Sequence, residues 1–462
     1  MTRDFNLVWM PCASMLAVIS VLPATAQDLQ AAPQLPLVRP EGAAAPPVVI
    51  TLADALERAR RNDAQYLSSV ADAEIAREDY VQARAAALPA FSNSTQYLGN
   101  QANGVNPNGR FVSLDGVHMY REWAIVRQEL SANTFTRAPI RKAQASEAVA
   151  QAKLEIARRG LNVTVTKAYH GLVAAERKYA TGQQAAQQAA RFLQVTQQQQ
   201  RLGQVAQSDV VKAEIQFRQQ EQNYQDAQVA MENARLTLAV LMFPTFNENF
   251  TVVDNRGSAP ALPAFADVRA MAERANPDLR SASESLRAAT EDVHVARNAF
   301  YPNLTIDGVY GIEANEFALH SAVAAQPELG VLPNLGYFVT VNLTVPIWDW
   351  GGLRSKLHQA ETRERHAQVG MSQAQRQLLS NLFSMYNEAL AARAAVDNFR
   401  RVADLATESL RLTNLRYGAG EATALEVVDA QNTLTQAENA FDDAETRYRV
   451  SLAELQTLTG SF

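Results

Sequence analysis

The sequence predicts a mainly α-helical fold built from two copies of one half-molecule, with a few β-strands inserted between the helices. Three observations lead to this prediction. The chain repeats itself, long segments contain almost no proline, and short segments alternate apolar and polar side chains. The repeated unit is far longer than the roughly 20–50 residues of a solenoid repeat. It therefore indicates a duplication in which each half builds the same elements.

Two glycine-containing segments show the repeat most clearly. Residues 202–214 read LGQVAQSDVVKAE, and residues 419–431 read AGEATALEVVDAQ. At one constant offset, Gly203 matches Gly420, Asp209 matches Glu426, and Ala213 matches Ala430. The same offset pairs Arg137 with Arg354, Tyr169 with Tyr386, and Leu238 with Leu455. We predict a first repeat over residues 49–255 and a second over residues 256–462.

The N-terminal segment resembles an export signal. Residues 1–26 contain Arg3, a mostly apolar run, and the Ala24-Thr25-Ala26 cleavage pattern. Residues 27–48, rich in proline and alanine, predict an extended leader. The only cysteine, Cys12, lies inside the predicted signal, so we expect a mature chain without disulfides or thiolate metal sites.

Each half is predicted to contain one very long helix and a shorter return helix. Apart from Pro139 near its start, residues 137–202 lack proline and are rich in strong helix formers. Such a helix is about 100 Å long at 1.5 Å per residue. Residues 354–416 repeat the pattern, and the return helices are expected at 208–243 and 425–459. A shorter helix opens each half, at 52–87 and 266–300.

The second return helix has two faces of different character. Val427, Ala430, Leu434, Ala437 and Phe441 recur at steps of three or four and predict a packed apolar stripe. A neighbouring set does not form an apolar stripe: Leu425, Val428, Asn432, Thr435, Asn439 and Asp442.

Two predicted hairpins separate the short and long helices. Residues 337–347 alternate apolar and polar side chains, as a strand with two different faces does, and residues 303–312 are the expected partner. In the first half, strands at 91–98 and 118–130 are assigned mainly from the repeat. The loops between paired strands, about 99–116 and 313–336, are long.

Four strands set a constraint on any membrane role. The mature sequence contains no apolar run of about 18 residues, so no transmembrane helix is predicted. Four strands cannot close a barrel, because the smallest transmembrane barrels have about 8. Either the strands form a soluble sheet, or several chains share one barrel.

The segment VPIWDWGGLRSK, residues 345–356, resembles the strand-to-helix motif of the TolC-type outer-membrane efflux proteins. The matching residues are Pro346, Ile347, Trp348, Asp349, Gly351 and Gly352. The first-half copy, residues 128–137, departs from the motif because Glu129 stands in place of proline. The resemblance covers about residues 50–460.

This resemblance implies a particular architecture and set of partners. The chain would form a homotrimer with a long antiparallel helical coiled-coil barrel crossing the periplasm. Each chain would contribute four strands to a shared transmembrane β-barrel of about 12 strands in the outer membrane. The partners implied are a periplasmic adaptor (membrane fusion protein), an inner-membrane pump and outer-membrane lipid.

The resemblance also assigns functional residues. Glu426 and Asp429, on one face of the last helix, would line the closed periplasmic end of the tunnel and select cations. The alternative is two solvated surface acids. Tyr417 would hold the tunnel shut by donating a hydrogen bond to Asp209, and the alternative for Tyr417 is plain packing at the helix end. The family arginine two residues after the turn glycine is replaced by Ala422, and Arg416 is a possible substitute.

Three glycines, Gly203, Gly418 and Gly420, are expected to use positive φ in the turns between helices, where the family meets its adaptor. Plain helix C-caps are the compatible alternative.

The functional prediction is a passive outer-membrane channel for efflux or secretion, driven by an inner-membrane pump. The alternative is a soluble periplasmic coiled-coil adaptor, which would lack the two hairpins. The six histidines form no metal or catalytic motif, and no nucleotide-binding pattern occurs, so we predict neither an enzyme nor a cofactor nor a metal site. The net charge of −6 argues against nucleic-acid binding. The transported compound is not encoded in any recognisable motif.

Overall fold

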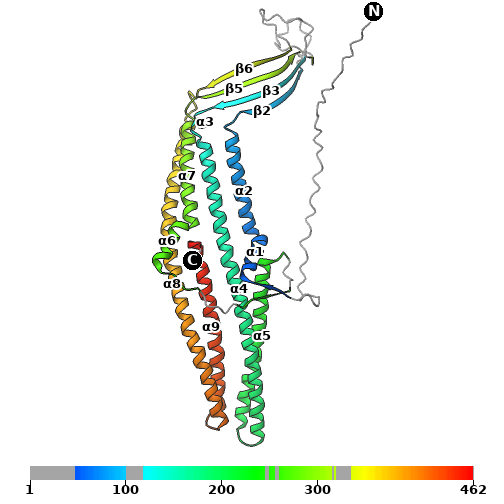
Figure 1. The fold of residues 1–462 in the computed structure, drawn as a ribbon, viewed down its shortest axis with the longest axis vertical. Helices are drawn as coiled ribbons and strands as arrows, with labels where there is room; N and C mark the ends of the chain where they lie inside the picture. Colours follow the sequence, from blue (N-terminus) through cyan, green and yellow to red (C-terminus); the bar gives the residue numbers. More distant parts are fainter. Residues whose placement is uncertain are drawn as a thin grey trace, which may run out of the picture.

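The protein is an elongated molecule with a β-sheet at one end and two helical hairpin tips at the other (Figure 1). The computed structural model describes residues 47–99, 118–244, 249–254, 260–314, 317–318 and 334–460. The predicted signal peptide, nearly all of the predicted leader, and most of the two long strand-connecting loops lie outside these residues.

Four helices form two helical hairpins, which are called the hairpins from here on. Helix α4 (Ala138–Arg201) has 64 residues and α8 (Gly352–Gly418) has 67, so both are close to 100 Å long, as predicted. Helices α5 (Gln207–Met242) and α9 (Ala424–Thr459) return along them. In the described part of the chain, no helix combines the length and apolar composition needed to cross a membrane.

The opening helix of each half was predicted as one element, and this is wrong. The first is divided into α1 (Leu52–Asn62) and α2 (Ala64–Ala85), and the second into α6 (Phe265–Ala275) and α7 (Pro277–Asn298). Asp63 and Asn276 adopt extended backbone at the breaks. Their side chains accept hydrogen bonds from the first turns of α2 and α7, at 2.7 and 2.8 Å. Each break is therefore a helix N-cap.

Apolar contacts hold each hairpin together. In the first half, Leu172 of α4 and Leu238 and Met242 of α5 are at most 1% exposed. In the second half, Leu382 of α8 and Leu455 of α9 are fully buried. Leu238 and Leu455 are repeat partners, so the duplication preserved the core position.

Two short strands that the sequence analysis missed join the start of the chain to its middle. β1 (Val48–Ile50) pairs in parallel with β4 (Phe250–Val252). The hydroxyl of Tyr169 on α4 donates to the Val253 carbonyl at 2.8 Å. Its repeat partner Tyr386 on α8 donates to the Pro263 carbonyl at 3.1 Å. Both tyrosines thus fix the segment between the halves to a long helix.

One arginine ties the two hairpins together. The Arg177 guanidinium of α4 donates to Asp442 at 3.0 Å and to Glu445 at 2.6 Å, both on α9, and to Asp254 at 3.0 Å. The Arg177 side chain is only 11% exposed. Burial alone would lower the pKa of Arg177, but these three carboxylates raise it above its ordinary value. We call Arg177, Asp254, Asp442 and Glu445 the charged hub.

A four-stranded antiparallel sheet closes the other end of the molecule. Its order is β2 (Ala90–Gly99), β3 (His118–Leu130), β5 (Asn303–Ala314) and β6 (Leu335–Thr344). The central pair β3–β5 joins the two halves of the chain, with Ala124 opposite Tyr310. The four predicted strands are confirmed, although β6 ends three residues before the predicted Ile347. Short helix α3 (Ala132–Thr136) follows β3.

We predict that Gly311→Ala disrupts the β3–β5 pairing. A Cβ atom at residue 311 would lie 1.9 Å from the Glu122 carbonyl oxygen, a clash with backbone that no rotamer relieves. Overpacking of this kind costs about 1–3 kcal/mol or more, so trypsin resistance and thermal stability of the purified protein should fall. The control is Gly336→Ala on the adjacent strand, where a Cβ meets nothing within 4 Å. Equal behaviour of the two variants would contradict the observed register.

We predict that Arg177→Met destabilises the protein, by about 3–5 kcal/mol, because it removes a buried cation that the Asp254, Asp442 and Glu445 carboxylates share. Denaturant unfolding measures the loss. Lys178→Met is the matched control: Lys178 pairs with Asp443 at 2.6 Å, but both side chains are more exposed, and such pairs contribute about 0–1 kcal/mol.

The charged hub also makes the stability of the protein depend on pH in the acid range. Burial alone would raise the pKa of Glu445, but hydrogen bonds from Arg177 and Arg449 hold it below the ordinary 4.5. The stabilisation is therefore complete above pH 4.5 and is lost as pH falls through the lowered folded-state pKa. Arg177→Met should weaken this acid-dependent loss, and an unchanged profile would argue against the hub.

Candidate gate at the tips of the helical hairpins

Both hairpins turn with the same backbone motif. At the first tip, the Gly203 amide donates to the Gln200 carbonyl and the Gln204 amide to the Gln199 carbonyl, at 2.9 and 2.8 Å. At the second tip, the Gly420 and Glu421 amides donate to the Tyr417 and Arg416 carbonyls, at 3.0 and 2.8 Å. These are Schellman motifs, and Gly203 and Gly420 occupy the left-handed position at φ 76° and 78°.

The prediction that Gly418 also uses positive φ is wrong. Gly418 is the last residue of α8, and Gly420 alone provides the left-handed turn at that tip. Gly418 and Gly420 lie two residues apart, so the sequence alone could not show which of them ends the helix and which forms the left-handed turn.

Glu426 is held by hydrogen bonds at the start of α9. Thr423 is the N-cap, and its hydroxyl and backbone amide both donate to Glu426 Oε1, at 3.2 and 3.1 Å. The Glu426 amide donates back to the Thr423 hydroxyl at 3.4 Å, which completes a capping box. The Thr-x-x-Glu spacing was visible in the sequence and could have predicted this contact.

Arg416 supplies the second partner of Glu426. Its guanidinium donates to Glu426 Oε2 at 3.2 Å and to the Glu421 carbonyl at 3.1 Å, so it crosses the tip from α8 to α9. The backbone hydrogen bond from Thr423, together with Arg416, holds the pKa of Glu426 below its ordinary value. Arg416 thus contacts a predicted gate acid, although it is displaced in sequence from the family position occupied by Ala422.

Asp429 lies on the same helix one turn further on and is exposed. Among the described residues, its carboxylate makes no hydrogen bond or ion pair, and only its backbone carbonyl accepts, from Thr433 at 2.7 Å. The two predicted gate acids therefore differ. The Glu426 carboxylate is paired with Arg416 and Thr423, whereas the Asp429 carboxylate is available to ions.

The predicted hydrogen bond between Tyr417 and Asp209 is not the one that the structure shows. The Tyr417 hydroxyl donates to Gln199 Oε1 at 2.8 Å, and its ring lies 5.5 Å from that of Phe192. Asp209 instead faces Lys212, three residues along α5, at 3.7 Å. The reason is local: the Tyr417 side chain reaches the end of α4, where Gln199 and Phe192 lie. Tyr417 still connects the two hairpins, through a residue that the sequence analysis missed.

The strand-to-helix motif orients α8 relative to the sheet. Asp349 Oδ1 accepts a hydrogen bond from the Gly351 amide at 3.1 Å, and Oδ2 accepts one from the Leu353 amide. Gly351, at φ 86°, provides the left-handed residue before the helix, and a Cβ on Gly352 would lie 3.2 Å from Asp349 Oδ2. Pro346 lies just beyond the end of β6, where it prevents the ladder from continuing because it has no amide hydrogen.

The sequence of the second half matches a known family. Residues 268–461 match the family model described as outer membrane efflux protein. The relative named pyoverdine export outer membrane protein OpmQ, from Pseudomonas putida, is 30% identical over 51% of this chain and 45% of its own length. The outer membrane protein TolC of Vibrio cholerae is 24% identical over 89% of this chain and 90% of its own length.

Solved structures extend the likeness to the whole described fold. The CmeC outer membrane channel of Campylobacter jejuni superposes with a TM-score of 0.72 at 18% identity, covering 88% of this chain and 85% of CmeC. The outer membrane protein VceC of Vibrio cholerae gives 0.71 at 18% identity, covering 89% and 96%. Residues 268–461 therefore carry the sequence of the outer membrane efflux protein family, and the described fold is that of the solved outer membrane channels.

Proposed function

We propose that this chain is a passive outer-membrane channel that exports compounds delivered by an inner-membrane pump through a periplasmic adaptor. The observation that carries the proposal is the four-stranded sheet, whose two faces differ in polarity and whose two edges are open. The proposal assigns the chain no enzymatic reaction and no cofactor.

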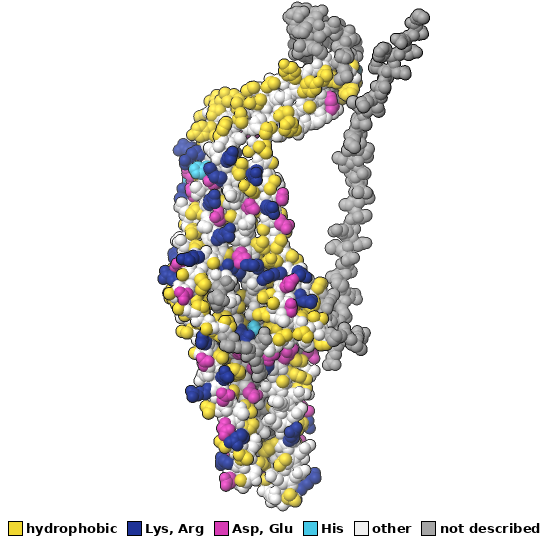
Figure 2. Space-filling model, viewed as in Figure 1, with side chains coloured by type: hydrophobic (Ala, Val, Ile, Leu, Met, Phe, Trp, Pro, Cys, Tyr) yellow, Lys and Arg dark blue, Asp and Glu magenta, His cyan; other side chains and the backbone are white. Residues whose placement is uncertain are grey.

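One face of the sheet is suited to lipid. Its side chains include seven large apolar or aromatic residues that are more than half exposed: Phe91, Tyr97, Tyr310, Tyr337, Val339, Val341 and Leu343. Figure 2 shows the sheet covered by hydrophobic side chains, whereas the helices below carry many charges. An exposed apolar surface of this kind marks a membrane or protein contact.

The opposite face is suited to water. Arg127 of β3 pairs with Asp307 of β5 at 2.6 Å, and Arg121 pairs with Glu313 at 2.9 Å. Ser92, Ser94, Thr340 and Asn342 share this face by their register. Transmembrane barrels have this arrangement, with apolar residues outside and polar residues toward the lumen.

Glu122 is the one acidic side chain on the apolar face of the described strands. Its carboxylate accepts hydrogen bonds from Asn93 at 2.6 Å and from Thr95, both on β2. A polar group in an apolar environment is tolerated when its hydrogen bonds are made locally. The exception is therefore consistent with a lipid-facing surface.

Strands β2 and β6 are the two edges of the sheet. Open edges leave backbone groups unpaired, which is costly inside lipid. We propose that three copies pair edge to edge into one shared barrel of about 12 strands. The hairpins then continue as a periplasmic tunnel, and the Gly203 and Gly420 tips meet the adaptor.

Relatives with similar sequences have names that describe different cargoes, pyoverdine export for OpmQ and cation efflux for CusC. A shared duct whose specificity comes from its pump accounts for such variety. The proposed tunnel therefore needs no binding site dedicated to one compound.

Membrane fractionation and chemical crosslinking test the proposal, together with conductance of the purified protein in planar bilayers. We expect an outer-membrane trimer that conducts ions. A soluble periplasmic monomer would instead favour the adaptor alternative.

We predict that replacing both tip acids lowers cation selectivity. In the double variant Glu426→Gln/Asp429→Asn, the glutamine introduced in place of Glu426 can still complete the capping box, so charge is removed without unwinding α9. Reversal potentials in a salt gradient should shift toward those of an unselective pore, and block by multivalent cations should weaken. The control Asp226→Asn removes a carboxylate from α5, remote from the tip. Unchanged selectivity in the double variant would leave both acids as surface residues.

We predict that Tyr417→Phe increases the open fraction of the channel about fivefold, because it removes one interhelical hydrogen bond worth about 1 kcal/mol. The ring remains packed on Phe192. A double-mutant cycle with Gln199→Ala identifies the partner: the two effects should not add, because they break the same bond. Additive effects would contradict the Tyr417–Gln199 pairing as the tie.

A further inference from the structure

The contact between the two hairpins changes character along its length. Nearest the tips is a small apolar patch of Phe192, Ala213, Ala424 and Val427. About 36 Å above the tip, by helix rise, lies the charged hub around Arg177. Between them, the hydrogen bonds that join α5 to α9 in the described structure come from amide side chains, beside an open cleft.

Asn432 of α9 is the centre of these amide contacts. Its Oδ1 atom accepts hydrogen bonds from Gln216 Nε2 at 2.7 Å and from Gln220 Nε2 at 3.0 Å, both on α5. Asn223 donates to Gln220 Oε1 at 3.4 Å and extends the set toward the cleft. We call Gln216, Gln220 and Asn432 the amide clamp.

Burial makes the clamp matter energetically. Gln216 and Gln220 are each only 5% exposed. Buried amide donors are costly when they lack an acceptor, and here one oxygen serves both. Removing the Asn432 side chain would therefore leave two buried donors without their partner.

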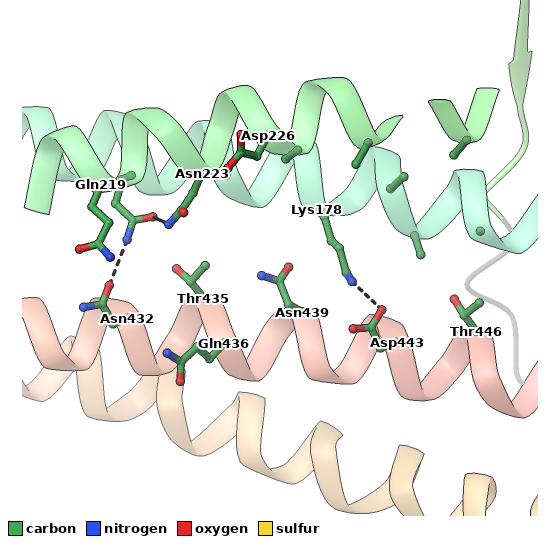
Figure 3. A pocket seen from close by; sticks show the side chains of 18 residues that line it. Lys178, Gln219, Asn223, Asp226, Asn432, Thr435, Gln436, Asn439, Asp443 and Thr446 are labelled. Atoms are coloured by element: carbon green, nitrogen blue, oxygen red, sulfur yellow. Dashed lines mark hydrogen bonds and ion pairs between the residues drawn. The ribbon is translucent and has the colours of Figure 1, made fainter. Parts of the chain in front are cut away.

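Above the clamp, the two hairpins are separated by a cleft of about 790 Å³ that is lined by both polar side chains and alanines. Figure 3 shows Asn432 at one end, the Lys178–Asp443 pair toward the other, and Thr435 and Asn439 between them. The Asn439 Oδ1 atom is buried and has no hydrogen-bond partner in the described part of the chain. The hairpins are therefore not packed tightly against each other along this stretch.

We propose that the amide clamp is a latch that holds α5 against α9 in the closed channel, above the Tyr417 tie and below the fixed hub. Opening breaks the clamp, and water then replaces Asn432 as the partner of Gln216 and Gln220. Amides suit a reversible contact because their hydrogen bonds can be exchanged for water, whereas a separated leucine seam exposes apolar surface. The role in gating rests on the proposed channel function.

Three variants at two neighbouring positions test the latch in the purified full chain. Asn432→Ala removes the shared acceptor and should raise the open fraction in planar bilayers by about tenfold or more. Asn432→Asp keeps an oxygen in the same place and should remain much closer to wild type. The control is Gln436→Ala, one turn along α9, which removes an amide from the same cleft but takes no part in the clamp.

A second measurement reports hairpin separation without relying on conduction. Ala213→Cys places a thiol in the apolar tip patch, where Ala213 is 1% exposed, on a chain whose only other cysteine is Cys12. Asn432→Ala should speed thiol labelling by about tenfold, and Gln436→Ala should not.

The outcomes separate the latch from the channel. If the wild type conducts but Asn432→Ala behaves like Gln436→Ala in both measurements, the latch is overturned and the channel function stands. If no variant conducts, the proposed function fails, and the labelling rates alone decide whether the clamp holds the hairpins together.

Discussion

The relative position of two long helical hairpins depends on where they are joined to each other. In this protein, the buried Arg177 joins them. Arg177 comes from the first half, and Asp442 and Glu445 come from the second, so neither half contains the hub alone. A buried charge is stable only when paired, and this makes the separation of α4 from α9 at this level costly. The hairpins are thereby fixed about 36 Å above their tips, by helix rise. Under the proposed latch, movement is confined to the part nearer the tips, where the contacts are the amide clamp, a small apolar patch and the Tyr417 hydroxyl.

Several positions have the same structural role in both halves, although different residues or contacts fill that role. Tyr169 and Tyr386 both donate to backbone between the halves. The entries into the long helices differ: α8 is capped by Asp349 after a left-handed Gly351, whereas α4 follows Arg137, a non-glycine residue at φ 54°. Left-handed backbone is unfavourable for arginine. The weak match of residues 128–137 to the family motif therefore reflects a different local solution to the same turn.

Local patterns predicted most of the fold. Low proline content and helix-forming composition predicted α4, α5, α8 and α9 within a few residues, and the repeat predicted β3. The breaks at Asp63 and Asn276 were also readable, because Asn276 precedes Pro277 as an N-cap precedes a first-turn proline. Contacts between the two hairpins could not be predicted from the sequence. Nothing in one sequence pairs Tyr417 with Gln199 rather than Asp209, since their relative height depends on how two long helices dock. Likewise, the sequence indicated that Asn432, Thr435, Asn439 and Asp442 are not part of an apolar stripe, but it did not indicate that they face the other hairpin.

In the proposed channel, the distribution of apolar and polar contacts would let one chain be rigid and still open. Inside each hairpin, leucines such as Leu382 and Leu455 are fully buried, so unzipping a hairpin exposes apolar surface. Between hairpins, separation of the clamp trades hydrogen bonds within the protein for hydrogen bonds to water, and the small patch around Phe192 and Val427 is the apolar surface that it exposes. The tip follows the same division. Glu426 caps α9 and pairs with Arg416 inside one hairpin, which keeps the turn intact, whereas Asp429, whose carboxylate has no partner among the described residues, provides charge that an ion can meet. A hairpin can therefore move as a unit while its own turn and core remain unchanged.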